Sequence, residues 1–375
     1  MLNIIFSPIS VRGGMAGNRR VENLIKKIQV YKEIRTKNIF FRHQDYQKMS
    51  ALKYCWNKCV RYIDLYKRIC KQKKRGKNIA YYYGAFGVPE ALLFWFLRYN
   101  KFYVIIDITE DSRLFPRELS KLDILYKLTN NCIAKYIQYF VNGTVVISDH
   151  LYKYLRLLIK NKDSVLKIPV SVDFDKYNVR KVNKTRGTVT AFYGGAYGLK
   201  DGVEEVIEAF NVLSLSIENI RLILVGQPER ECKVKLLLLL KNLNNPKISY
   251  KGYVSSRQYH KLIHECDILI VPRRNVPYAL GGYPFKLGEY MATGNAVLCS
   301  SIKEVREMFA DTELCFYNPD DKKDLQKQML SLIVNKDLRC RIGRNGKARA
   351  VHYFDSRNHA KILRSWLNSS KIEDS

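Results

Sequence analysis

Short apolar runs alternate with amphipathic segments of helix length along the whole chain, in two sets separated by a polar stretch. Continuous apolar runs between helices are typical of parallel strands that are covered on both faces. The sequence therefore predicts an α/β fold with two Rossmann-like, doubly wound parallel-sheet domains. The predicted strands are LNIIFS, NIAYYY, YVIIDI, GTVVIS and VLKIPV in the first set, and TVTAFYGG, IRLILVG, KISYKGY, DILIVP and NAVLCS in the second.

The stretch between the two sets, residues 174–187, is polar, basic and weakly periodic, so we interpret it as a linker. It divides the chain into a first domain at 1–175 and a second domain at 187–354. The segment 355–370 has helical spacing and is predicted to cross back to the first domain. Ligands of doubly wound sheets bind beyond the carboxyl ends of the strands, so we expect the two domains to face a cleft.

No apolar run reaches the roughly 18 residues that a transmembrane helix needs. The richest run, ALLFWFLRYNKFYVIIDI, is interrupted by Arg98, Asn100 and Lys101, which divide it into a helix and a buried strand. The first residues, MLNIIFSPIS, have the pattern of a strand rather than of a signal peptide. Nine cysteines at irregular spacings fit a reducing compartment, so we expect a cytoplasmic protein.

The formal net charge of +30 indicates polyanionic surroundings, which nucleic acid, anionic lipid or phosphorylated ligands would each provide. Segment 53–77 concentrates this charge, with ten Lys and Arg residues against the single acid Asp64. Two interpretations of the segment stay open: a surface helix packed on a sheet, or an interfacial contact with a membrane. An amphipathic helix with a basic outer face is predicted by apolar residues at 52, 55, 56, 59, 60, 63, 66 and 70.

Three patterns that resemble metal sites are incomplete. Cys55 and Cys59 stand one helical turn apart, but no second pair or nearby histidine completes a zinc set. His260 and His264 have the same spacing without a third ligand, and we interpret them as surface and core side chains. The VDFD motif at 172–175 lies in the interdomain linker. We therefore expect no bound metal and no cofactor.

The second half of the chain carries a series of motifs, in the order KIPVSVDFDKY, FYGGAYGLKDGVEEVIEAF, LILVGQPE, ISYKGYVSSRQYHKLIHECDILIVPRR and PFKLGEYMATGNAVL. The series resembles the nucleotide-sugar-dependent glycosyltransferases of family 4, over residues 145–360. The resemblance implies the GT-B fold, which consists of two Rossmann-like domains. It also implies that sugar is transferred from a nucleoside diphosphate to an acceptor hydroxyl with retention of configuration and without an obligatory metal.

The resemblance gives a role to Glu289, which stands in an apolar, glycine-punctuated run. A buried carboxylate must be hydrogen-bonded or paired. We expect Glu289 just ahead of a helix that begins at YMA. In the family this residue accepts hydrogen bonds from the ribose hydroxyls of the nucleotide, whose two donors suit its two oxygens. The alternative is a carboxylate at a helix N-terminus, stabilised by the helix dipole.

The resemblance also implies a phosphate site in the turn GLKDG. Lys200 is expected to contact the diphosphate there and to act in catalysis, because a strand-to-helix turn presents amides and positive charge to an anion. The arginine that the family usually carries five residues earlier is Gly195 in this chain. Either Arg273 or Arg274, after the strand DILIVP, replaces that cation, or both arginines are solvated.

A second departure is Gly281, which stands where many family members have the first of two glutamates eight residues apart. The run GGYPFK still offers backbone amides near the phosphates, and Lys286 either adds charge there or pairs at the surface. The expected donor-binding residues are Gly195, Lys200, Gly226, Tyr253, Val254, Arg273, Gly282, Tyr283, Pro284, Phe285, Lys286 and Glu289.

In the first domain, SPISVRGGMAGNRR follows a predicted strand and opens a helix. Its glycine pair, Gly13 and Gly14, resembles the acceptor-side loop of the family and lacks the spacing of a dinucleotide fingerprint. Asp111, after the strand YVIIDI, is the second expected catalytic residue, in contact with donor or acceptor. A helix N-cap role for Asp111 or Ser112 is the alternative.

We therefore expect a hexosyltransferase-like glycosyltransferase of cell-surface polysaccharide or glycolipid biosynthesis. Its expected partners are a nucleotide-sugar donor, a glycan or lipid-linked acceptor, and an anionic membrane surface at the inner face of the membrane. One alternative is a basic nucleic-acid-binding protein on a degenerate transferase scaffold, although the sequence shows no recognisable DNA- or RNA-binding module. The other is a nicotinamide-dependent oxidoreductase, which would need the missing fingerprint.

Overall fold

The chain divides into two compact units. Unit 1 comprises Met1–Ser171, Gly281–Tyr283 and Ser356–Ser375, and unit 2 comprises Val172–Leu280 and Pro284–Asp355. The computed structural model describes residues 1–10, 16–41, 51–114, 128–129, 131–178, 187–198, 200–228, 230–280 and 282–369.

Unit 1 is built on a six-stranded parallel sheet in the order β2-β1-β3-β4-β5-β6. The inner strands are apolar along most of their length because helices cover both faces of the sheet. The strands are β1 (Leu2–Ser10), β2 (Ile34–Phe41), β3 (Lys77–Tyr83), β4 (Tyr103–Ile108), β5 (Gly143–Val146) and β6 (Val165–Lys167).

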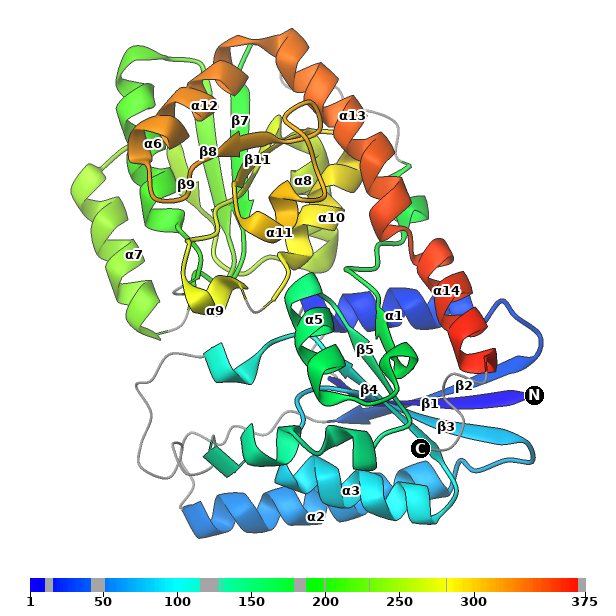
Figure 1. Ribbon diagram of the computed structural model, residues 1–375. Coiled ribbons are helices and arrows are strands. Elements are labelled where there is room, and N and C mark those ends of the chain that lie inside the picture. The colour runs from blue at the N-terminus through cyan, green and yellow to red at the C-terminus, as the bar shows by residue number, and fades with distance from the viewer. Residues whose placement is uncertain are drawn as a thin grey trace. The chain divides into compact units, whose positions relative to one another are not determined.

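The helices of unit 1 lie in two layers (Figure 1). α1 and α14 pack together on one face of the sheet, whereas α2 and α3 lie side by side on the other face. The helices are α1 (Ala16–Ile28), α2 (Ala51–Cys70), α3 (Val88–Tyr99), α5 (Asp149–Leu158) and α14 (Ser356–Asn368), with 3₁₀ turns at Ser112–Leu114, Ile137–Tyr139 and Lys162–Ser164.

The C-terminal helix α14 is part of the hydrophobic core of unit 1. Leu363 and Trp366 pack in the same cluster as Ile4 of β1 and Val145 of β5. Gly143 at the start of β5 leaves room for the indole, because a Cβ atom there would lie 2.5 Å from Cη2 of Trp366. Burial of large apolar side chains of this kind stabilises a fold by about 1.5–3 kcal/mol each.

Helix α2 turns a different face toward unit 1 than the one that the sequence pattern predicts. Val60 and Ile63 belong to the predicted inner face, yet they are 47% and 55% exposed. Leu65 and Ile69 are buried in their place. The prediction of an apolar inner face at these positions is therefore wrong, and the outer face of α2 is partly apolar.

A polar contact explains this orientation of α2. The Tyr62 hydroxyl donates to Oε1 of Glu90, a buried residue of α3, and also lies 3.2 Å from the hydroxyl of Tyr82 on β3. A buried carboxylate is costly without partners, so these contacts fix the side of α2 that faces α3 and the sheet.

A buried ion pair joins α1 to the centre of the unit 1 sheet. Nη1 of Arg20 lies 2.5 Å from Oδ2 of Asp107, and both side chains are fully buried. The Tyr81 hydroxyl donates to the same carboxylate oxygen at 2.6 Å, and Arg20 also donates to the carbonyls of Ile168 and Pro169. Burial lowers the pKa of Arg20, but the charge and hydrogen bond of Asp107 together with Tyr81 and Tyr83 outweigh it, so the net shift is upward.

Unit 2 contains a second six-stranded parallel sheet, in the order β12-β11-β10-β7-β8-β9. The chain starts at β7, moves outward through β8 and β9, and then continues from β10 outward on the opposite side. The strand order therefore reverses between β7 and β10. The strands are β7 (Val189–Gly194), β8 (Ile220–Val225), β9 (Ile248–Tyr250), β10 (Ile268–Val271), β11 (Ala296–Ser300) and β12 (Cys315–Tyr317).

The helices of unit 2 also cover both faces of their sheet. α6 and α12 pack together on one face, and α10 packs with α8 and α13 on the other. The helices are α6 (Val203–Ser216), α7 (Arg230–Leu243), α8 (Ser256–Glu265), α9 (Pro277–Leu280), α10 (Phe285–Thr293), α11 (Lys303–Arg306), α12 (Lys322–Val334) and α13 (Lys336–Phe354), with a 3₁₀ turn at Phe174–Tyr177.

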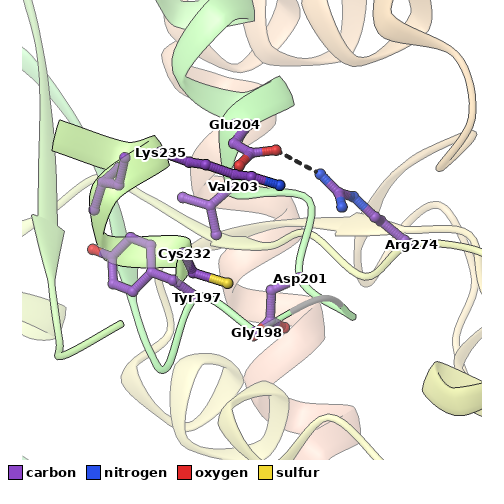
Figure 2. A pocket seen from close by; sticks show the side chains of 9 residues that line it. Tyr197, Gly198, Asp201, Val203, Glu204, Cys232, Lys235 and Arg274 are labelled. Carbon is purple, nitrogen blue, oxygen red and sulfur yellow. Dashed lines mark hydrogen bonds and ion pairs between the residues drawn. The ribbon is translucent and has the colours of Figure 1, made fainter. Parts of the chain in front are cut away.

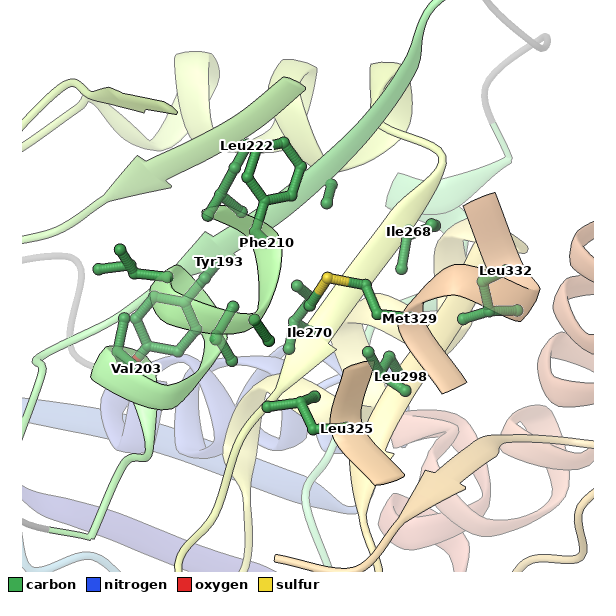
Figure 3. Packing of buried hydrophobic residues seen from close by; sticks show 14 of the residues in the cluster. Tyr193, Val203, Phe210, Leu222, Ile268, Ile270, Leu298, Leu325, Met329 and Leu332 are labelled. Atoms are coloured by element: carbon green, nitrogen blue, oxygen red, sulfur yellow. The ribbon is translucent and has the colours of Figure 1, made fainter. Parts of the chain in front are cut away.

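The main core of unit 2 fills the space between its sheet and the α6–α12 layer (Figure 3). Phe210 of α6 and Met329 of α12 contribute to it, together with Leu222, Ile270 and Leu298 from the strands. All five side chains are fully buried. This close packing makes the carboxyl ends of the strands a rigid edge.

The predicted strands and the α/β fold with two doubly wound parallel sheets are confirmed. β2 and β12 are not among the predicted strands, because β2, with the sequence IRTKNIFF, mixes charged and polar residues with apolar ones, and β12 is the short run CFY. The predicted linker begins in the turn Phe174–Tyr177, whose first and last residues are buried, and residues 179–186 lie outside the described residues. Within the described chain, no helix has both the length and the apolar character needed to span a bilayer.

Candidate functional site

The carboxyl ends of β7 and β10 define the candidate site, because ligands of doubly wound sheets bind where the strand order reverses. Three segments of unit 2 meet there: the turn 195–202 between β7 and α6, the residues after β10, and the first turns of α10. Asp201 of the turn pairs with Arg273 in an antiparallel bridge, and the amide of Gly202 donates to the Pro272 carbonyl at 2.6 Å. The turn and the loop after β10 are thus joined.

Two glycine backbones are in contact at the ends of β7 and β8. A Cβ atom on Gly226 would lie 1.8 Å from the carbonyl oxygen of Gly195, and Gly226 has a φ of +125°, which favours glycine. The amide of Gly195 donates to the Val225 carbonyl, and that of Gly226 donates to the Gly252 carbonyl. This close approach fixes the path of the chain at Gly195.

The Lys286 side chain lies directly over Gly195. A Cβ atom on Gly195 would lie 1.9 Å from Nζ of Lys286 and 2.5 Å from the hydroxyl oxygen of Tyr193. The ammonium group donates to that hydroxyl at 3.3 Å and lies 4.4 Å from the centroid of the Tyr193 ring. Lys286 therefore occupies the space that a side chain at position 195 would need.

The surroundings of Lys286 lower its pKa to about 8. Burial is the largest cause, since it disfavours the charged form. The carboxylates of Asp201 and Glu289 raise the pKa, whereas Arg273 and Lys200 lower it further. Three cationic side chains thus gather at one strand end against two carboxylates, an arrangement that a bound anion would stabilise.

Neither of the two arginines after β10 takes the place over Gly195. The guanidinium of Arg274 donates to Glu204 at 3.0 Å and to Glu205 at 3.1 Å, so its charge is balanced locally. Arg273 is buried and its Nη1 donates to the Ala279 carbonyl at 2.8 Å. The alternative that both arginines are solvated is wrong, because both are bonded within unit 2.

Glu289 lies inside α10 rather than ahead of it. The helix begins at Phe285, so the prediction that it begins at YMA is wrong. The alternative role at a helix N-terminus also fails, since the dipole effect is confined to the first turn. The carboxylate is 7% exposed, and its Oε2 accepts a hydrogen bond from the Tyr259 hydroxyl at 3.3 Å. Lys286 precedes it by three residues, on the same side of the helix.

Buried tyrosines that the sequence analysis missed hold the site together. The hydroxyl of Tyr290 accepts a hydrogen bond from the amide of Gly194 at 3.1 Å and so links α10 to the end of β7. The Tyr197 hydroxyl donates to the Val225 carbonyl at 3.2 Å, and its ring meets that of Tyr193 edge to face. Their positions in FYGGAY and GEYMA, beside the predicted site residues, are the signal that could have identified them.

The other predicted donor-binding residues are divided between the units. Tyr253, which is exposed, and Val254 follow β9 in unit 2. Gly282 and Tyr283 belong to unit 1, where Gly282 pairs with Glu110 in an antiparallel bridge. Contact of these residues with a donor stays a prediction. Four further predicted donor-binding residues lie in unit 2, at the β7–α6 turn and around the start of α10: Lys200, Pro284, Phe285 and Lys286.

A small pocket opens between the β7–α6 turn and α7 (Figure 2). Its volume is about 50 Å³. Ligand pockets usually reach roughly 300–1,000 Å³, so this one suits water-sized groups and not a nucleotide. The ion pair between Arg274 and Glu204, at 3.0 Å, borders it. Its lining residues are Tyr197, Gly198, Asp201, Val203, Glu204, Cys232, Lys235, Leu236 and Arg274.

Asp111 in unit 1 is held by Arg113 and His150 of its own unit. Its carboxylate accepts hydrogen bonds from Nε and Nη2 of Arg113 at 2.8 and 2.5 Å, and its Oδ2 lies 2.8 Å from Nε2 of His150. Burial raises the pKa of Asp111, but these partners outweigh it and the pKa is lowered. Oδ1 of Asp111 also accepts a hydrogen bond from the Arg113 amide at 3.1 Å, as expected if Asp111 caps the 3₁₀ turn that begins at Ser112. Contact of Asp111 with a donor or an acceptor stays a prediction.

Gly13 and Gly14 of the predicted acceptor-side loop lie outside the described residues. The rings of His260 and His264 are tilted against Tyr177, with centroids 5.5 and 5.7 Å from its ring, so they pack against the turn Phe174–Tyr177. In the part of the chain that the structure describes, no group of three or more His, Cys, Asp or Glu side chains is placed to hold a metal ion.

Comparison with known proteins agrees with this geometry. Residues 175–349, most of unit 2, match the family model described as glycosyl transferases group 1. An uncharacterized glycosyltransferase of Methanocaldococcus jannaschii is 23% identical over 215 residues, which are 56% of this chain and 57% of the relative. The match thus spans little more than half the length of that relative.

Solved structures match nearly the whole chain. Sucrose-phosphate synthase from Thermosynechococcus elongatus superposes with a TM-score of 0.71 at 14% identity, over 98% of this chain and 99% of that one. Anabaena Alr3699/HepE in complex with UDP and glucose gives a TM-score of 0.69 at 12% identity, over the same shares of the two chains. The chain therefore has the GT-B fold, and the family match supports a glycosyltransferase.

Proposed function

We propose that this protein transfers a sugar from a nucleoside diphosphate sugar to an acceptor hydroxyl, with retention of the anomeric configuration. The observation that carries the proposal is the placement of Lys286 and Glu289 on one side of α10, where the strand order of unit 2 reverses. The group 1 match covers this region, and the Anabaena neighbour has been solved with UDP and with UDP-glucose.

The two charged groups suit the two polar parts of a nucleoside diphosphate. The Lys286 ammonium, with Lys200 nearby, provides positive charge for the diphosphate beside the end of β7. Glu289, one turn further along α10, offers two carboxylate oxygens to the two hydroxyls of a ribose. The hydroxyls of a ribose would add hydrogen bonds to this buried carboxylate beside the one from Tyr259, and such bonds lower the cost of its burial.

The transfer itself depends on stabilising the leaving group. The bond between the anomeric carbon and the diphosphate oxygen breaks, and the acceptor oxygen bonds to the same face of that carbon. Lys286 and Lys200 stabilise the negative charge that develops on the departing diphosphate, which is the kind of electrostatic effect that dominates many enzymatic reactions. The departing phosphate accepts the proton of the acceptor hydroxyl. These cations provide the charge compensation that a metal would otherwise supply.

The acceptor in this proposal is a hydroxyl of a glycan or of a lipid-linked precursor in cell-surface polysaccharide or glycolipid synthesis. The support for it is the net charge of +30, which suits an acceptor that carries phosphates or lies close to anionic lipid.

Nucleotide binding tests the proposal. Thermal unfolding of the wild type is measured with UDP, GDP, CMP or NAD, alongside Glu289→Ala and the matched control Glu218→Ala, which removes an exposed carboxylate of the same unit. At about 100 times Kd a ligand adds roughly 2.7 kcal/mol, so we expect one nucleoside diphosphate to raise the Tm by about 5 °C or more.

The shift should disappear in Glu289→Ala and persist in Glu218→Ala. A shift of equal size in both variants would contradict the role of Glu289. Stabilisation by NAD alone, or retention on RNA without any nucleotide shift, would contradict the proposed function as a whole.

A further inference from the structure

Helix α3 of unit 1 is apolar on both its inner and its outer face. Ala91, Phe94 and Leu97 are buried against the unit. On the other face, residues at i, i+3, i+4 and i+7 form an outward stripe of large apolar side chains. A helix that is apolar all round is normally buried on all sides, whereas the described residues of unit 1 leave this outer face exposed. The stripe consists of Leu92, Trp95, Phe96 and Tyr99, which are 57%, 54%, 47% and 78% exposed.

The outward stripe continues onto α2, which lies beside α3 (Figure 1). Val60 and Ile63 of α2 are exposed, and the rings of Tyr66 and Phe96 lie 5.9 Å apart and join the two helices. We call the six residues Val60, Ile63, Leu92, Trp95, Phe96 and Tyr99 the aromatic surface. Contiguous apolar patches of this kind usually mark a contact with a protein or a membrane.

The charges around the aromatic surface are almost entirely positive. Asp64 is the one exposed acid on α2 and α3, since Glu90 is buried. Lys67 and Lys71 of α2 are exposed, as is Lys101 just after α3. Aromatic and aliphatic side chains flanked by lysines suit the boundary between anionic head groups and acyl chains, where each basic residue near the surface contributes about 1 kcal/mol.

We propose that α2 and α3 dock unit 1 onto an anionic lipid bilayer, with the aromatic surface entering the head-group region. Binding of a second copy is disfavoured because a face-to-face contact would bring the flanking lysines of both copies together. Base stacking on RNA is disfavoured because Leu92, Val60 and Ile63 offer no π face, and Trp95 and Tyr99 already stack on each other, 6.3 Å apart. The inference is independent of the proposed function, which rests on unit 2.

Vesicle sedimentation tests this contact. Wild-type protein is mixed at about 0.15 M salt with vesicles of phosphatidylcholine alone, or with roughly 30% phosphatidylglycerol added. The test variant is Trp95→Ser/Tyr99→Ser, which alters two exposed side chains. The control is Val30→Ser/Leu157→Ser, which removes two apolar side chains of unit 1 that are 74% and 85% exposed and lie off α2 and α3. A third variant, Lys67→Glu/Lys71→Glu, tests the charge.

The wild type and the control should sediment with anionic vesicles, and the partition coefficient of Trp95→Ser/Tyr99→Ser should fall at least about 10-fold. Lys67→Glu/Lys71→Glu should lose the preference for anionic lipid. Equal partitioning of the test variant and the control would overturn the proposal. So would a dimer in sedimentation equilibrium, or RNA retention, that Trp95→Ser/Tyr99→Ser abolishes while vesicle binding is absent. UDP binding by each variant reports separately on the site in unit 2.

Discussion

The ammonium nitrogen of Lys286 lies 1.9 Å from the point where a Cβ atom on Gly195 would be. Position 195 is where the resembled family usually carries an arginine, and in this chain the cation that lies over position 195 comes from α10. The glycine and the lysine are therefore linked, because neither position can change without affecting the other.

The first prediction is that Gly195→Ala weakens binding of a nucleoside diphosphate. The new methyl group would lie 1.9 Å from Nζ of Lys286 and 2.5 Å from the hydroxyl oxygen of Tyr193, so both the ammonium and the Tyr193 hydroxyl must shift. Loss of a hydrogen bond to a charged group costs about 1.5–3 kcal/mol, so we expect Kd to rise roughly 10- to 100-fold in a calorimetric titration. The control is Gly198→Ala, because a Cβ atom there meets nothing within 4 Å and should leave Kd unchanged.

The second prediction concerns pH. The pKa of Lys286 is lowered to about 8 by burial, so its charge is lost as the pH rises through that value. Because diphosphate binding needs the charged form, the affinity should fall above pH 8, by up to about tenfold per pH unit. Calorimetric titrations between roughly pH 7 and 9.5 check this, and they should also show proton uptake on binding near pH 8. Lys286→Met should bind weakly and with no such dependence. A wild-type affinity that is flat across this range would count against a charged Lys286 at the diphosphate.

The same pKa shift has the opposite effect on stability. Between pH 8 and the usual value of 10.5, the unfolded chain binds a proton at this lysine and the folded chain does not. The contribution of Lys286 to the free energy of unfolding therefore rises with pH across this window.

The third prediction is that Arg20→Leu destabilises unit 1. Removal of the arginine leaves the Asp107 carboxylate buried without its cationic partner, which typically costs about 3–5 kcal/mol. Denaturant unfolding checks this, with Arg341→Leu, an exposed position on α13, as the control that should change stability by less than about 0.5 kcal/mol. The double variant Arg20→Leu/Asp107→Leu should recover part of the loss, because no unpaired charge remains. Wild-type stability in Arg20→Leu would show that the pair is not needed for folding.

The fourth prediction tests the packing of α14. Gly143→Ala places a methyl group 2.5 Å from Cη2 of Trp366, so we expect a loss of about 1–3 kcal/mol from overpacking. The double variant Gly143→Ala/Trp366→Leu should recover part of this loss, because the smaller leucine leaves space for the new methyl group. Both variants are compared by thermal unfolding. If Trp366→Leu deepens the defect instead, the collision with the indole is not its cause.

The strand pattern of both sheets could be predicted because continuous apolar runs carry the signal of strands covered on both faces. The register of α2 could not, because both of its faces carry apolar residues. The polar contact of Tyr62 with Glu90 decides which face turns inward, and that contact joins residues 28 positions apart. Sequence periodicity does not contain this information.

The candidate site was predictable in outline and not in detail. Motif order indicated the turn 195–202 and the residue Glu289, since both lie in recognisable local patterns. Which cation stands over Gly195 depends on the approach of α10 to β7, a tertiary contact between residues 91 positions apart along the chain, and on the buried Tyr193 ring that supports Lys286. Local sequence patterns therefore cannot tell whether Lys286 or Arg273 is the cation over Gly195.

A calorimetric titration of the cognate nucleoside diphosphate into the wild type, Lys286→Met and Lys286→Met/Gly195→Arg tests the central claim most directly. Lys286→Met removes Nζ, the atom nearest to a side chain at position 195, and the Tyr193 hydroxyl, 2.5 Å from a Cβ atom there, must still move aside for the arginine. The account predicts that Lys286→Met weakens binding by about tenfold or more, and that Lys286→Met/Gly195→Arg recovers part of the lost affinity. Binding of the nucleotide by Lys286→Met as tightly as by the wild type would contradict it.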